Sequence, residues 1–86
     1  MYYPYCTIME SIEVVHTPLK NGYTIVHFEK PDKIYGFKTL DCVIPSYRVN
    51  NIVGFSDTEV SELVTFCRNN ASLLLKYASE GGIANA

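Results

Sequence analysis

The clearest structural signal in the chain is Phe55-Ser56-Asp57-Thr58-Glu59-Val60, which marks the start of a helix. The Ser56 side chain can accept a hydrogen bond from the amide of Glu59, and the Glu59 side chain can accept one from the amide of Ser56. These reciprocal bonds form a capping box. Phe55 and Val60 occupy the two positions of a hydrophobic staple. The sequence therefore predicts a helix that begins at about residue 57.

The same helix is predicted to end at about residue 80, because Gly81-Gly82 can adopt the left-handed closure that terminates helices. Residues 84–86 are expected to form a frayed tail. At roughly 100° per residue, the apolar side chains of the helix fall within one arc. That arc contains Val60, Leu63, Val64, Cys67, Ala71, Leu74, Leu75 and Ala78. We expect it to pack on one face of a sheet.

A second, narrower stripe of large side chains lies on nearly the opposite side of the predicted helix. It contains Phe66, Leu73 and Tyr77. Exposed apolar residues at this spacing indicate that something covers them. Two alternatives could cover this stripe. One is the tyrosine-rich segment 2–5 of the same chain, and the other is a partner or second subunit. Phe66, Leu73 and Tyr77 are therefore the candidate interaction surface.

The residues before the helix predict β-strands, because β-branched and aromatic residues alternate between two faces. Three strands are expected, at about 8–16, 23–30 and 34–44. Asn21-Gly22 favours a hairpin turn between the first two, since both residues tolerate positive φ. Pro31 is expected to end the second strand, because proline cannot donate to a ladder.

Residues 47–53 are ambiguous, because Val49, Ile52 and Val53 favour a short fourth strand and Asn50-Asn51 favours a turn. The 86 residues have the size of one domain, spanning 1–86. The sequence thus predicts an α+β fold. It consists of an antiparallel three- to four-stranded meander sheet with one long C-terminal amphipathic helix packed on one face.

The composition is that of a folded domain, with 48% hydrophobic and 19% charged residues. The net charge is −2, and the cations are scattered along the chain. Nucleic-acid binding usually requires a concentrated positive patch. Folding could bring Lys30, Lys33 and Lys38 together, but a mixed solvated surface is the simpler interpretation, so the composition argues against nucleic acid as a partner.

The cellular compartment can be inferred from the cysteines and from the first residues of the sequence. Three cysteines without a short repeating spacing do not form a disulfide framework, which favours a reducing cytosol. The first residues lack the basic and apolar regions of a secretory signal. No apolar run approaches the roughly 20 residues that span a bilayer. We expect a cytoplasmic protein with no membrane partner.

The residues that could carry chemistry form no recognisable catalytic pattern. A Cys–His nucleophile would need one of the cysteines close to His16 or His27. Zinc binding by Cys6, Cys42, His16 and His27 would lack the paired spacing of known sites. No glycine-rich phosphate loop precedes a helix. The sequence predicts no catalytic residue, metal or cofactor.

A family resemblance is carried by the C-terminal half of the chain. The residues concerned are Val53-Gly54-Phe55-Ser56-Asp57-Thr58-Glu59, Asn69-Asn70 and Leu73-Leu74-Leu75. This half resembles a family of small bacterial proteins of unknown function that are often encoded beside toxin–antitoxin-like genes. Those relatives usually carry Pro-Pro-His-x-His on the second strand, where this chain has a single histidine in residues 24–28. They also tend to have tryptophan where this chain has Tyr77. The resemblance implies a sheet-plus-helix fold and a regulatory or interaction role.

Three functions remain open at the level of sequence. The first is a non-enzymatic protein–protein interaction or self-associating regulatory module, whose partner is a second copy, as in a homodimer, or another small protein. The second is a small hydrolase or nuclease-like enzyme that uses His27, for which Asp41 or a cysteine would have to lie within reach. The third is a nucleic-acid-binding regulator.

Overall fold

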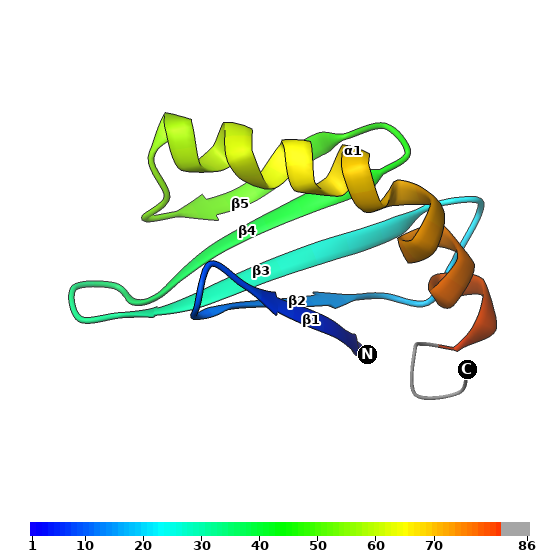
Figure 1. The fold of residues 1–86 in the computed structure, drawn as a ribbon, viewed down its shortest axis with the longest axis horizontal. Helices are drawn as coiled ribbons and strands as arrows, with labels where there is room; N and C mark the ends of the chain where they lie inside the picture. Colours follow the sequence, from blue (N-terminus) through cyan, green and yellow to red (C-terminus); the bar gives the residue numbers. More distant parts are fainter. Residues whose placement is uncertain (82–86) are drawn as a thin grey trace.

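The computed structural model describes residues 1–81, so the predictions for Gly82 and for the tail 84–86 lie outside the described residues. The described chain forms a five-stranded antiparallel sheet in the order β1-β2-β3-β4-β5, followed by one helix, α1. Figure 1 shows α1 lying across one face of the sheet. The expected α+β class, antiparallel meander and single C-terminal helix are confirmed. The expected number of strands, three to four, is wrong.

The additional strand comes from the N-terminal tyrosine-rich segment. β1 (Tyr3–Ile8) pairs with β2 (Ile12–His16), whereas the sequence predicts a single strand at about 8–16. The expected strand is interrupted because Met9 and Glu10 have φ angles of 46° and 70° and reverse the chain direction. Neither residue is a typical left-handed turn former, so the pattern of side chains did not reveal this turn.

β3 (Thr24–Asp32) and β4 (Gly36–Ile44) form the longest hairpin of the sheet. Asn21-Gly22 forms the turn before β3. On either side of it, Lys20 and Tyr23 each donate their backbone amide to the carbonyl oxygen of the other. β3 continues through Pro31, contrary to the expectation. Its pairing with β2 ends at Glu13–Glu29, so at Pro31 one side of β3 is an edge, where the missing amide is tolerated.

β5 (Arg48–Val53) is the strand that the sequence left open. It pairs with β4, and one extra residue is accommodated between the pairs Asp41–Asn50 and Thr39–Val53. Asn51 lies in this irregular part and has a φ of 55°. The conflicting signals of residues 47–53 thus have one physical explanation, because the segment is a strand that contains a left-handed asparagine.

Helix α1 (Asp57–Glu80) begins with the capping box that its sequence indicates. Ser56 Oγ accepts from the Glu59 amide at 3.2 Å, and Glu59 Oε1 accepts from the Ser56 amide at 2.9 Å. At the other end Gly81 has a φ of 86°, and its amide donates to the Tyr77 carbonyl. The local sequence therefore sets both ends of the helix.

The core lies between α1 and the face of the sheet that it covers. Alternate residues of the three central strands point into it, as do four-residue-spaced positions of the helix. The buried apolar set is Ile12, Val14, Val26, Phe28, Leu40, Cys42, Ile44, Phe55, Leu63, Cys67, Leu74 and Ala78. In residues 1–81, no helix has the length and apolar character that crossing a bilayer requires.

Candidate functional site

The face of the sheet opposite α1 is left uncovered by the other elements of the described chain (Figure 1). Residues that alternate with the core positions point to this open face. Val15, Ile25 and Val43 are half-buried there, and Tyr23 is exposed. A network of polar side chains lies further along the same strands, centred on His27.

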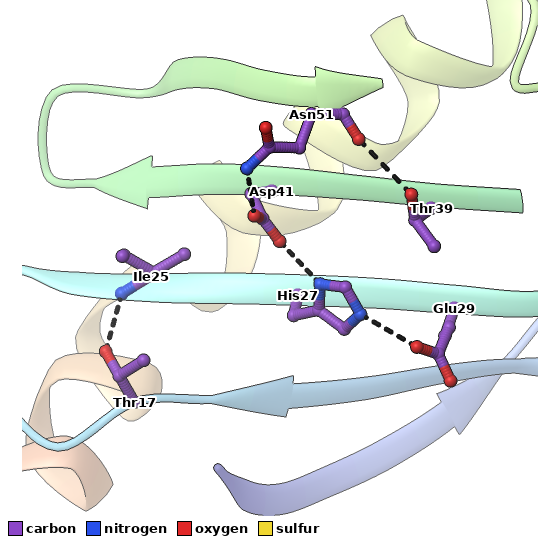
Figure 2. A network of polar contacts seen from close by, with 7 residues as sticks. All are labelled: Thr17, Ile25, His27, Glu29, Thr39, Asp41 and Asn51. Carbon is purple, nitrogen blue, oxygen red and sulfur yellow. Dashed lines mark hydrogen bonds and ion pairs between the residues drawn. The ribbon is translucent and has the colours of Figure 1, made fainter. Parts of the chain in front are cut away.

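His27 is held between two carboxylates, as Figure 2 shows. Its Nδ1 lies 2.5 Å from Oδ1 of Asp41, its cross-strand partner on β4. Its Nε2 lies 3.1 Å from Oε1 of Glu29, two residues further along β3. Asn51 extends the network from β5 by donating its side-chain amide to Asp41 Oδ2 at 2.8 Å. Three neighbouring strands thus contribute to one polar cluster.

The two contacts of the His27 ring favour its charged form. Carboxylates only accept hydrogen bonds, and a neutral imidazole has only one N–H to donate. Both ring nitrogens of His27 can therefore be satisfied only when the ring is an imidazolium. Burial lowers the pKa of His27, but the hydrogen bonds and negative charges of Asp41 and Glu29 outweigh it, so the pKa is raised above its ordinary value.

The sequence does not single out two members of the His27 environment, Glu29 and Asn51, and it indicates Tyr2 only as part of the tyrosine-rich segment 2–5. Glu29 could have been found, because it lies two positions from His27 on the same face of a strand. The position of Asn51 beside Asp41 could not be predicted, because it depends on the register of the irregular strand β5. Tyr2 stacks on the His27 ring with the ring centroids 5.2 Å apart, a contact that required β1 to exist.

The cysteines do not join His27. Cys42 and Cys67 are buried in the core on the opposite side of the sheet, and Cys6 lies exposed on β1. A hydrogen bond with Cys42 and burial raise the pKa of the Cys67 thiol, so it stays protonated. Among residues 1–81, no group of three histidine, cysteine, aspartate or glutamate side chains is arranged to hold a metal ion.

His16 is fully buried on the helix side of the sheet. Its Nδ1 lies 3.0 Å from the Thr17 carbonyl oxygen, and the Tyr3 and Tyr5 rings surround it. Its Nε2 has no hydrogen-bond partner within the described residues. This side chain is enclosed by aromatic rings, which places it in the packing of the core.

The predicted interaction surface is partly covered by β1. The Tyr5 ring lies 6.3 Å from the Phe66 ring and 6.2 Å from the Tyr77 ring, and its hydroxyl donates to Asn70 Oδ1 at 2.9 Å. Leu73 keeps 46% of its surface exposed. The tyrosine-rich segment thus contacts two of the three residues, and Leu73 remains open to solvent.

A hollow of about 360 Å³ adjoins this surface, between the first half of α1 and the β1–β2 turn. We call it the Phe66 hollow. Its lining residues are Met9, Ser61, Glu62, Thr65, Phe66 and Asn69. Met9, at the border of the hollow, is 52% exposed. The lining combines two large apolar side chains, Met9 and Phe66, with polar ones that include the carboxylate of Glu62.

The three lysines that folding could bring together, Lys30, Lys33 and Lys38, do approach one another. Lys30 and Lys38 are cross-strand partners at the outer end of the β3–β4 hairpin, and Lys33 lies in the turn that joins the strands. Apolar side chains accompany them, since Ile34, Tyr35 and Phe37 are all exposed.

Comparisons of the chain with protein-family models, with curated proteins and with solved structures found no match. The fold and the site define a two-layer α+β domain with an uncovered sheet face, a carboxylate-bound histidine and a hollow of mixed lining beside its helix.

Proposed function

We propose that this protein is a non-enzymatic protein–protein interaction module that self-associates through the helix surface around Phe66 and Leu73. The observation that carries the proposal is the Phe66 hollow, in which Met9 and Phe66 lie among polar side chains, together with the exposed Leu73 further along the same helix. Concave apolar surface with a few polar groups is typical of binding sites. The family resemblance of the C-terminal half supports a regulatory role in a bacterial cytoplasm, as one member of a toxin–antitoxin-like gene pair.

The edges of the sheet favour association through a face. Free edge strands otherwise provide the simplest route to pairing between copies. Here β1 and β5 each carry an irregularity, between Pro4 and Cys6 in β1 and opposite Thr39–Asp41 in β5. Pro4 also lacks an amide hydrogen. Both edges therefore interrupt the row of groups that a continuous intermolecular sheet requires.

Sedimentation of the purified protein over a wide concentration range tests self-association. We expect the wild type to associate, and Leu73→Asp and Thr65→Arg to weaken association, because both change exposed residues of this surface. Tyr23→Asp on the open face is the matched control. Phe66 is unsuitable for substitution, since its ring lies 5.9 Å from that of Phe28 in the core. A wild type that stays monomeric throughout would reject the proposal.

The enzyme alternative has one observation in its favour, the short bond between His27 and Asp41. A catalytic base requires a free ring nitrogen that can reach substrate. In this structure Glu29 occupies the second nitrogen, so His27 would act only after Glu29 moved away. Esterase and nuclease assays on wild type, Glu29→Gln and His27→Gln separate the two functions. Turnover that rises in Glu29→Gln and disappears in His27→Gln would establish the enzyme.

The nucleic-acid alternative is favoured by the three lysines at the end of the β3–β4 hairpin. Retention on immobilised heparin or DNA that falls steeply with salt would support it. We expect the protein to flow through at low salt, because three lysines neutralise few phosphates and the chain as a whole is acidic.

A further inference from the structure

The tip of the β3–β4 hairpin, residues 30–38, presents the most exposed group of large apolar side chains in the described chain. The exposed fractions are 86% for Ile34, 58% for Tyr35 and 51% for Phe37. Figure 1 shows the hairpin projecting past the rest of the domain. Single exposed apolar residues are ordinary, but three within four positions at a projecting tip indicate a contact surface.

The tip is also basic and internally fixed. It carries Lys30, Lys33 and Lys38 against one carboxylate, Asp32, in a chain whose net charge is −2. Lys38 Nζ lies 3.9 Å from Glu59 Oε1 of the same chain, so Lys30 and Lys33 supply the positive charge that the tip can offer to a partner. Asp32 Oδ2 accepts the backbone amides of Ile34 and Tyr35, each at 3.0 Å, so this carboxylate is used inside the turn. A turn held in this way loses little conformational entropy when it binds.

The Phe66 hollow contains one carboxylate, that of Glu62. The first part of α1 carries no lysine or arginine before Arg68. Its other early carboxylates, Asp57 and Glu59, do not line the hollow, and Glu59 Oε1 lies 3.9 Å from Lys38 Nζ of the same chain. Arg68 lies over the Tyr47 ring, with its guanidinium carbon 4.2 Å from the ring centroid. The hollow thus places the side chains of Met9 and Phe66 next to one carboxylate, that of Glu62, among other polar residues.

We propose that the hairpin tip of one copy docks in the Phe66 hollow of a second copy, in a head-to-tail contact. This inference rests on the proposed self-association and names its two surfaces. The projecting tip offers Lys33 next to the exposed Ile34, and the hollow offers Glu62 next to Met9 and Phe66, so charge and apolar surface are complementary. Each pair leaves one tip and one hollow free, which extends the assembly into a ring or an open chain.

Charge reversal on each surface tests the contact. Lys33→Glu and Glu62→Lys should each weaken association about tenfold or more, because like charges then face each other. Both residues are exposed, so both variants should remain folded by circular dichroism. Lys20→Glu, an exposed position in a different turn, makes the same charge change as Lys33→Glu and should associate like the wild type.

Mixing the two variants gives the decisive measurement. In an equimolar mixture, the acidic tip of Lys33→Glu meets the basic hollow of Glu62→Lys. The unchanged tip of Glu62→Lys meets the unchanged hollow of Lys33→Glu, so association measured by sedimentation should recover to the wild-type level. The double variant Lys33→Glu/Glu62→Lys should also recover on its own. Ile34→Asp, which removes the apolar apex, should not associate by itself.

The outcomes separate this inference from the proposed function. If the wild type associates and Lys33→Glu and Ile34→Asp associate equally well, the head-to-tail contact is wrong while self-association stands. If both reversals weaken association but the mixture does not recover, the two surfaces do not meet. A wild type that is monomeric at every concentration removes both proposals.

Discussion

The Nδ1 atom of His27 lies 2.5 Å from Oδ1 of Asp41, its directly opposite partner across the β3–β4 ladder. With Glu29 on the other nitrogen, the ring lies between two carboxylates on the open face, and their hydrogen bonds and charges raise its pKa against the opposing effect of burial. Only part of the ring meets solvent, since the His27 side chain is 18% exposed and that of Asp41 is 14% exposed.

The pKa of His27, followed by NMR titration, should lie above the ordinary value of about 6.5. Asp41→Asn should lower this pKa more than Glu29→Gln does. The reason is that Asp41 makes the shorter bond and is less exposed than Glu29, whose side chain is 42% exposed. Equal effects of the two substitutions would contradict the unequal geometry of the two bonds.

Stability should depend on pH through the same group. Because the pKa of His27 is raised in the folded state, its contribution is complete below the unfolded value of about 6.5 and is lost as the pH rises through the folded value. Urea denaturation at a series of pH values measures this effect. The difference in free energy of unfolding between wild type and His27→Gln should shrink as the pH rises through this window. Parallel curves for the two proteins would mean that the carboxylates do not hold the proton.

The adjacent residues Leu73 and Leu74 should respond very differently to truncation. Leu74 is 0% exposed in the core, whereas Leu73 is 46% exposed. Leu74→Ala should lower the free energy of unfolding by about 2–5 kcal/mol, because it removes buried methyl groups and leaves a cavity. Leu73→Ala should change it by no more than about 0.5 kcal/mol. Chemical denaturation of the monomeric protein measures both values.

Substitutions at Gly22 and Gly54 distinguish the stability cost of left-handed backbone strain from the cost of steric contact. Both have a positive φ, of 83° and 82° respectively. A Cβ at Gly22 would meet nothing within 4 Å, but one at Gly54 would lie 2.8 Å from Lys38 Cγ and 3.0 Å from Tyr35 Cδ2. Gly22→Ala should cost about 1–2 kcal/mol of stability through left-handed strain. Gly54→Ala should cost about 1 kcal/mol more, because its neighbours must also shift.

Ser56→Ala should lower the free energy of unfolding by about 1 kcal/mol, because the Glu59 amide loses its partner at the helix end. Thr58→Ala, an exposed change in the same turn, is the control and should have a smaller effect. Thermal or urea denaturation gives the comparison. Equal losses would show that the cap contributes nothing beyond the helical preference of the residues.

The sequence by itself determined the elements whose cause is local. The ends of α1 follow from Ser56, Glu59 and Gly81, each of which bonds to a residue within four positions. The Asn21-Gly22 turn is equally local. The core face of the helix follows from its period, which is the same in any surrounding structure.

Tertiary structure decided what depends on distant residues. β1 exists because a turn at Met9-Glu10 folds the tyrosine-rich segment onto β2, where Tyr5 reaches Phe66 and Tyr77 of the helix. The His27 site required the β3–β4 register, since Asp41 lies fourteen positions away in sequence and a shift by one residue would turn it to the core face. Such long-range choices are made by packing over the whole sheet, and no local pattern of residues encodes them.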